Sequence, residues 1–146
     1  MIGKYKKFNK ELFEQNDLKS RQVVKTFLLS KNILVDDNIN KYGVDLISED
    51  GNVQVEIERR PTWNKEEFPY DKVNIPERKA KFFKSDKVSY VVVSNDYSRL
   101  GIIQGKKLIN FINDHNLKES SNKFISSGEM FYKIPKEEFK WFKIDN

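Results

Sequence analysis

The chain has 146 residues, and among them there is no cysteine, a single histidine and only four prolines. It also has no apolar run near the roughly 20 residues that a membrane-spanning helix needs. The missing cysteine excludes thiol catalysis, disulfide bonds and cysteine-ligated zinc, and it is compatible with a cytoplasmic, intracellular protein. His115 stands in a polar Asn-Asp-His-Asn stretch and is expected at the surface. With a mean hydropathy of −0.72, no membrane partner and no secretory signal are expected.

Several familiar catalytic patterns are missing as well. There is no Gly-X-Ser-X-Gly context for a serine hydrolase and no Gly-X-X-X-X-Gly-Lys loop for ATP. There is no internal repeat and no Pro/Gly-rich linker, so one domain over residues 1–146 is the simplest organisation. Lysine and arginine number 27 against 22 acidic residues, a net charge of +5 that mildly favours polyanionic partners.

Periodicity and capping signals predict an α/β fold. Asp17 is expected to cap a helix over 18–31, and the two-residue period from 43 to 59 predicts a β-hairpin. An irregular loop is expected over 62–74. The remaining expected elements are a strand at 33–35, a helix at 77–84, a buried strand at 87–94, a short strand at 102–103, a helix at 106–113, and strand, turn, then strand or short helix over 130–144. This order predicts one mixed sheet covered by helices.

The hairpin is the most informative part of the chain. If Asp50-Gly51 forms a two-residue turn, counting outward places Asp45 opposite Glu56. Alternate residues share a sheet face, so Glu58 joins them there. The other face then carries the apolar residues Val44, Leu46, Val53, Val55 and Ile57. Two carboxylates set opposite each other repel, and a cation between them removes that cost. The pattern therefore indicates a metal site.

The same residues carry a resemblance to a known family. Gly43-Val-Asp45-Leu-Ile47, followed by Val55-Glu56-Ile-Glu58-Arg-Arg60, resembles the paired motifs of the PD-(D/E)XK nuclease superfamily. The likeness covers residues 17–93. It implies a restriction-endonuclease-like fold, a mixed β-sheet flanked by helices. It also implies an endonuclease that hydrolyses phosphodiester bonds of DNA with Mg²⁺ or Mn²⁺, with Asp45 and Glu56 as metal ligands.

The chain departs from the family pattern at Glu58, which stands where the family usually has a catalytic lysine. The resemblance implies that Glu58 acts as general base or as a second-metal ligand. Lys79 and Lys81, on the following helix, are candidates for a displaced lysine. A second departure lies on the preceding helix, where Arg21 stands near a position that often holds glutamate.

Basic and aromatic residues cluster just after the carboxylates. Interleaved cations and aromatic rings suit a phosphate backbone and unstacked bases. The predicted nucleic-acid contacts are Arg59, Arg60, Trp63, Lys65, Lys72 and Arg78. The alternative is a solvated loop and helix face, with Trp63 folded back as part of a minor core.

Other interpretations remain open. The acidic residues can be solvated, with Glu58 paired to Arg59, Arg60 or a lysine. The fold can be a catalytically inactive nucleic-acid-binding module, or a protein-interaction domain that uses the aromatic C-terminal segment. A domain this small that cuts both DNA strands usually has to dimerise, so a homodimer is one predicted assembly.

Overall fold

The computed structural model describes residues 10–114, 118–119 and 130–144, and His115 lies outside them. Six strands form the main sheet in the order β1-β2-β3-β5-β6-β9. Only the β3–β5 pair is parallel, and the other four pairs are antiparallel. The six strands are β1 (Asp36–Asp37), β2 (Leu46–Ile47), β3 (Gln54–Arg60), β5 (Val88–Ser94), β6 (Arg99–Ile103) and β9 (Lys140–Lys143).

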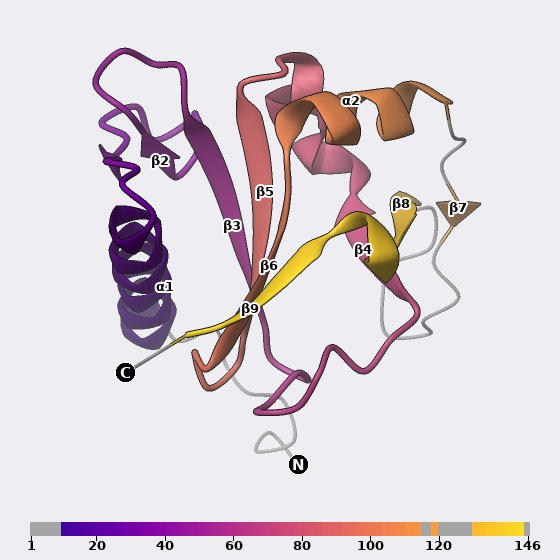
Figure 1. Cartoon of the computed structure of the whole chain (residues 1–146), viewed down its shortest axis with the longest axis horizontal. Coiled ribbons are helices and arrows are strands. Elements are labelled where there is room, and N and C mark those ends of the chain that lie inside the picture. Colours follow the sequence, from indigo (N-terminus) through magenta and orange to yellow (C-terminus); the bar gives the residue numbers. More distant parts are fainter. Residues whose placement is uncertain (1–9, 115–117, 120–129, 145–146) are drawn as a thin grey trace.

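The two faces of the main sheet are covered by different elements. The long helix α1 (Lys10–Ser30) lies on one side, and α2 (Gly105–Asp114), β4 (Lys72–Pro76) and β8 (Met130–Pro135) lie on the other (Figure 1). The central strand β5 is buried on both faces because its residues alternate between two cores. Val91 and Val93 pack with Val24 and Leu28 of α1, whereas Tyr90 and Val92 pack with Leu108 of α2.

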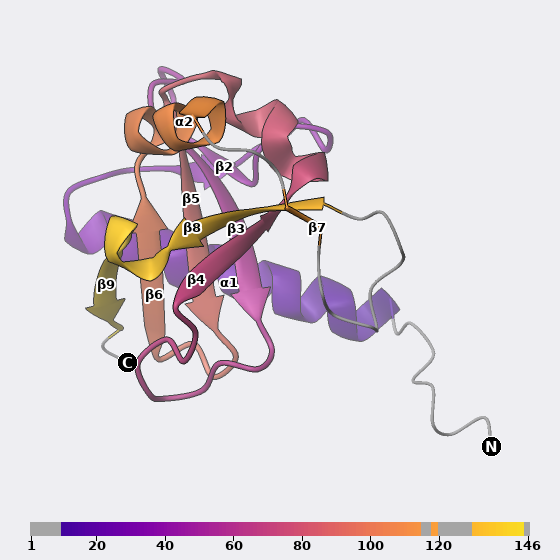
Figure 2. The ribbon, with the colours of Figure 1, turned by 90° about the vertical axis from the view of Figure 1, so that its right-hand side faces the viewer.

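A second, three-stranded sheet has the order β4-β8-β7 and was not predicted from the sequence. Its strands are β4 (Lys72–Pro76), β7 (Lys118–Glu119) and β8 (Met130–Pro135). The prediction of an irregular loop over 62–74 is therefore wrong at the end of that range. Val73 and Ile75 are buried in the core, and they pair with Ile134 and Tyr132 of β8. Figure 2 shows β4 and β8 side by side.

Other boundaries also differ from the expectations. Helix α1 begins at Lys10, so Asp17 lies inside the helix and is not its N-cap. The strand expected at 33–35 is found directly after that range, as β1 at Asp36–Asp37. Residues Glu77–Lys84 form η2, a 3₁₀ helix interrupted at Phe83, in place of an α-helix. The C-terminal segment folds as predicted, with the short helix η3 (Lys136–Glu138) between β8 and β9.

The strand predicted at 87–94 and the helix at 106–113 are confirmed as β5 and α2, and the strand at 102–103 lies within β6. The predicted α/β class, a mixed sheet flanked by helices, is confirmed. In the part of the chain that the structure describes, no helix is both long and apolar enough to cross a membrane.

Candidate active site

The hairpin register that defines the site is confirmed. Leu46 pairs with Val55 and Ile47 with Gln54, the pairs obtained by counting from the turn. The turn itself differs, because Gly51 N–H donates to the Ser48 carbonyl over 2.9 Å and the chain reverses through four residues. Gly51 has φ of 74°, a left-handed conformation that favours glycine. The Asp50 carboxylate holds this turn by accepting from the Asn52 N–H.

Asp45 and Glu56 are brought together at the start of the hairpin. The Asp45 Oδ2 atom accepts a hydrogen bond of 2.8 Å from the Ile57 N–H, which fixes its carboxylate against β3. Glu56 is only 6% exposed. Burial raises the pKa of Glu56 to about 7 against the opposing effect of the Lys79 ammonium, and the nearby Asp45 carboxylate adds to the rise. Burial also raises the pKa of Asp45, although the Ile57 hydrogen bond opposes it.

A lysine from η2 completes this cluster. The Lys79 Nζ atom lies 3.1 Å from Glu56 Oε2 and 3.2 Å from Glu58 Oε2. Glu58 Oε1 lies 3.2 Å from Arg60 Nη2. Glu58 is therefore paired with two cations. Its predicted roles as general base or second-metal ligand stay predictions, because a carboxylate oxygen with one partner still has a lone pair to offer.

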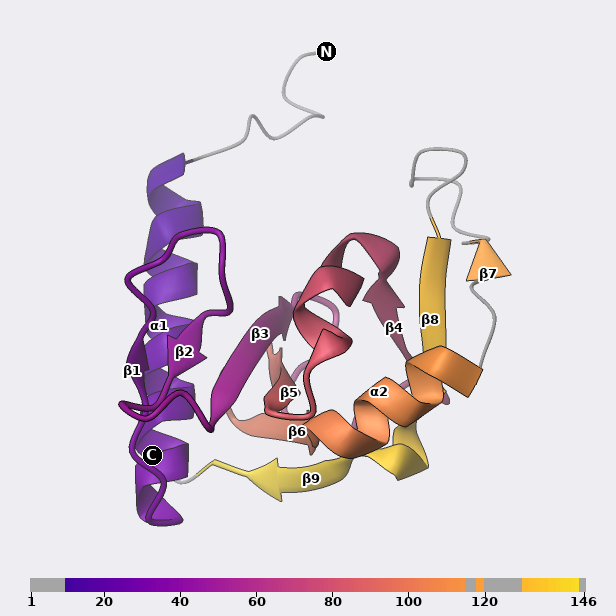
Figure 3. The ribbon, with the colours of Figure 1, turned by 90° about the horizontal axis from the view of Figure 1, so that it is seen from above.

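Asp45, Glu56, Glu58 and Lys79 line a cavity of about 670 Å³ whose walls come mainly from α1, β3 and η2. Figure 3 shows α1 and β3 from above. Of the two lysines proposed as a displaced lysine, Lys79 reaches the carboxylates. Lys81 lines the cavity farther along, with its Nζ 5.0 Å from the centre of the Phe82 ring. The full lining is Asn16, Asp17, Ser20, Asp45, Glu56, Ile57, Glu58, Arg59, Pro61, Arg78, Lys79, Lys81 and Phe82.

Asp17 is a site residue that the sequence reasoning missed. It lies on α1, lines the cavity and contributes to the raised pKa of Asp45 through its negative charge. Its carboxylate is paired with Arg21, one turn later on the same helix. The signal was present in the sequence as an acid on the helix before the hairpin, but it was interpreted as an N-cap because the helix was expected to begin there.

The predicted nucleic-acid contacts divide into three groups. Arg59 and Arg78 line the cavity, and Lys65 and Lys72 are exposed but lie outside its lining. The prediction for Trp63 is wrong, because this side chain is 1% exposed and packs against Phe68 and Trp141.

Arg60 is committed to internal partners. Its Nη2 atom donates to the Asn74 carbonyl over 2.6 Å and to the Tyr90 hydroxyl over 2.9 Å, in addition to its pairing with Glu58. Trp63 and Arg60 are therefore not available as nucleic-acid contacts.

The carboxylates of the site are the candidate ligands for a divalent cation. Among the described residues, no group of three or more His, Cys, Asp or Glu side chains is arranged to hold a metal ion. The three-carboxylate set of Asp45, Glu56 and Glu58 is therefore not assembled. The Asp45–Glu56 pair fits Mg²⁺ or Mn²⁺, because Mg²⁺ is commonly held by one or two carboxylates, with water and substrate phosphate completing the shell.

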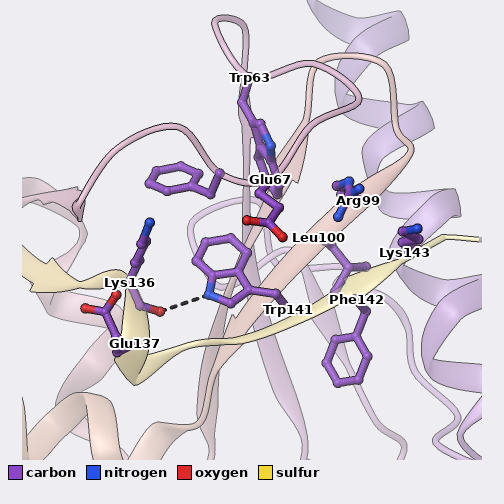
Figure 4. A pocket seen from close by; sticks show the side chains of 10 residues that line it. Trp63, Glu67, Arg99, Leu100, Lys136, Glu137, Trp141, Phe142 and Lys143 are labelled. Carbon is purple, nitrogen blue, oxygen red and sulfur yellow. Dashed lines mark hydrogen bonds between the residues drawn. The ribbon is translucent and has the colours of Figure 1, made fainter.

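A separate cavity of about 470 Å³ lies near β6 and β9, away from the carboxylates. Trp63, Phe68, Trp141 and Phe142 contribute its apolar surface, with Arg99, Lys136 and Lys143 among its charged residues (Figure 4). The Trp141 indole N–H donates to the Lys136 carbonyl over 2.9 Å. Its lining also includes Glu67 and Glu137, but Asp45, Glu56 and Lys79 lie in the other cavity, to which the chemistry is assigned.

Comparisons with known proteins do not decide the function of this chain. No protein-family model matches the chain, and no curated protein matches it. Among solved structures, a nuclease from a fusselovirus is similar over 93% of this chain and 89% of its own, with 16% sequence identity and a TM-score of 0.47. The functional argument below therefore rests on the geometry of the site.

Proposed function

We propose that this protein is a metal-dependent endonuclease that hydrolyses phosphodiester bonds of DNA with Mg²⁺ or Mn²⁺. One observation carries the proposal: the buried Glu56 carboxylate and the half-buried Asp45 carboxylate lie beside the Lys79 ammonium in a cavity with further cations on its walls. Buried, like-charged groups raise each other's pKa and cost stability, and such clusters concentrate at functional sites.

Asp45 and Glu56 would hold the metal ion. Their shared face of the hairpin and the Ile57 N–H bond to Asp45 fix both side chains in place before any ligand binds. Bound there, the ion would lower the pKa of a coordinated water and polarise a phosphoryl oxygen of the substrate.

The family pattern usually has a catalytic lysine where this chain has Glu58. In our proposal Lys79 supplies that positive charge. Its ammonium is within reach of the carboxylate pair and would donate to a non-bridging oxygen of the attacked phosphate, stabilising charge that develops there. Glu58 acts as a positioning residue, because it holds Lys79 from the opposite side and is itself held by Arg60. The exposed Arg78 and Lys81 would bind neighbouring phosphates.

The proposal is tested with a panel of linear, supercoiled, branched and single-stranded DNA, together with RNA, incubated with Mg²⁺, Mn²⁺ or EDTA. The Glu56→Ala protein is compared with Glu49→Ala, a matched control that removes an exposed glutamate from the same hairpin. We expect metal-dependent DNA cleavage by the wild-type and Glu49→Ala proteins and none by Glu56→Ala. Equal cleavage by all three proteins would contradict the assignment.

A second function is favoured by one observation. Lys79 forms ion pairs with both Glu56 and Glu58, an arrangement that a non-catalytic nucleic-acid-binding module would keep. That function predicts salt-sensitive DNA binding that is indifferent to Mg²⁺, with no cleavage under any condition of the panel.

A further inference from the structure

The cavity that holds the carboxylates continues into a second groove. Lys81 and Phe82 line both, and beyond them the groove runs between η2 and the loop that joins β1 to β2. This part has a volume of about 460 Å³. In Figure 3 the loop is the wide purple arc beside α1 and β2.

The loop presents two large apolar side chains to solvent. Tyr42 is 86% exposed and lines the groove, and Ile39 is 98% exposed. Single exposed apolar side chains are common on protein surfaces, so exposure alone indicates no function. Tyr42 is informative because its exposed ring lines the groove that adjoins the candidate active site.

The loop that carries them is braced by its own hydrogen bonds. Asn38 Oδ1 accepts from the Asn40 N–H over 3.1 Å, and Asn40 Oδ1 accepts from the Tyr42 N–H over 3.0 Å. The Gly43 N–H donates to the Asn40 carbonyl over 3.1 Å. A Cβ added at Gly43 would lie 2.6 Å from the Asn38 side-chain amide nitrogen, so the base of the loop is closely packed. Tyr42 is therefore held outward by ordered backbone.

The chemistry of the groove matches one class of ligand. Its charged lining residues are the lysines Lys81 and Lys84, and no acidic residue of the described chain lines it. Its polar side chains include the amides of Asn38, Asn40 and Gln54. Lysines bind phosphates, amides can pair with base edges, and an exposed tyrosine ring offers a stacking surface.

We infer that this groove binds an unpaired stretch of nucleic acid, with one base stacked on Tyr42, next to the phosphate presented to Asp45 and Glu56. The inference rests on the proposed function and narrows its substrate class. In an intact duplex the base faces are covered by their neighbours, and exposing one requires unstacking and unpairing it. The substrate is therefore single-stranded DNA or a branched structure with a single-stranded arm.

The inference is tested by binding alone, so that it can fail independently of catalysis. The dissociation constants of a fluorescently labelled single-stranded oligonucleotide and of the matching duplex are measured by anisotropy in EDTA, at one fixed salt concentration. The proteins compared are wild type, Tyr42→Ala, Tyr42→Phe and Tyr70→Ala. Tyr70 is the matched control, because it is also exposed but lines neither part of the groove.

We expect the wild type to prefer the single strand, and Tyr42→Ala to weaken single-strand binding by about tenfold, as loss of one base–aromatic stack does. Tyr42→Phe keeps the ring and should bind as the wild type does, as should Tyr70→Ala. Duplex binding should be the same for all four proteins. Because Tyr42 makes few contacts with the fold, matching thermal unfolding curves are expected and exclude misfolding as the cause.

Unchanged single-strand binding by Tyr42→Ala would overturn the inference, and so would an equal loss of single-strand and duplex binding. The cleavage panel reports separately on the proposed function. Loss of cutting in Glu56→Ala together with normal binding by Tyr42→Ala would retain the nuclease and reject the stacking site.

Discussion

Glu56 is expected to destabilise the metal-free fold at neutral and alkaline pH, and Glu56→Gln should relieve that cost. Burial raises the pKa of Glu56 from its ordinary value of 4.5 to about 7. One pKa unit corresponds to about 1.36 kcal/mol, so ionising Glu56 in the folded state costs about 3.4 kcal/mol. This value already includes the stabilising charge of Lys79. Because Lys79 loses that charged partner in the glutamine variant, we expect a net gain on the order of 1–3 kcal/mol at about pH 8.

The direction of the pH dependence follows from the raised pKa. The folded state holds the Glu56 proton more tightly than the unfolded chain, so the stability linked to this group is complete below about pH 4.5 and is lost as the pH rises through about 7. The difference in unfolding free energy between Glu56→Gln and the wild type should therefore grow across this window.

The assay is urea unfolding in EDTA at about pH 5 and about pH 8, with Glu49→Gln as the exposed control. The wild type should lose stability relative to Glu56→Gln at the higher pH, and Glu49→Gln should follow the wild type. An identical pH dependence for wild type and Glu56→Gln would refute the reasoning, because the buried carboxyl would then carry no cost of ionisation.

Three further predictions follow from the same geometry. Mg²⁺ at about 100 times its Kd should stabilise the wild type against thermal unfolding by about 2.7 kcal/mol, and a similar gain in Asp45→Asn would contradict the ligand assignment. Lys79→Met should lower the single-turnover cleavage rate by about 10²–10³-fold, and Lys81→Met should lower it less. A larger loss of rate in Lys81→Met than in Lys79→Met would show that the wrong lysine was assigned. Trp63→Ala should cost about 3–5 kcal/mol in urea unfolding, since the side chain is buried; a change within about 0.5 kcal/mol would mean that Trp63 is not part of the core.

The part of the candidate site that lies on the hairpin could be predicted from the sequence, because side chains along a strand alternate between the two faces of the sheet. Alternation along the hairpin fixed the register, and with it the shared face of Asp45 and Glu56, even though the turn has a different form. The burial of β5 on both faces follows from an apolar run bounded by polar residues.

Features set by tertiary packing could not be obtained in this way. Lys79 and Lys81 are equivalent in sequence, and the way η2 packs against β3 determines that Lys79 reaches Glu56. Trp63 lies in a loop whose polar, charged composition predicts exposure to solvent. The loop nevertheless folds over β9 and buries the Trp63 ring against Trp141. Asp17 was misassigned because the polar first turns of α1 gave no clear start signal.

The central claim is that Asp45 and Glu56 hold a divalent ion for phosphodiester hydrolysis. The most direct test is the single-turnover cleavage rate of the best DNA substrate as a function of Mg²⁺ concentration, for wild type, Asp45→Asn and Glu49→Gln. The account predicts a saturable, Mg²⁺-dependent rate for the wild type and Glu49→Gln, and no detectable cleavage by Asp45→Asn at any Mg²⁺ concentration. A wild-type rate that persists in EDTA, or an Asp45→Asn rate equal to the wild type, would contradict it.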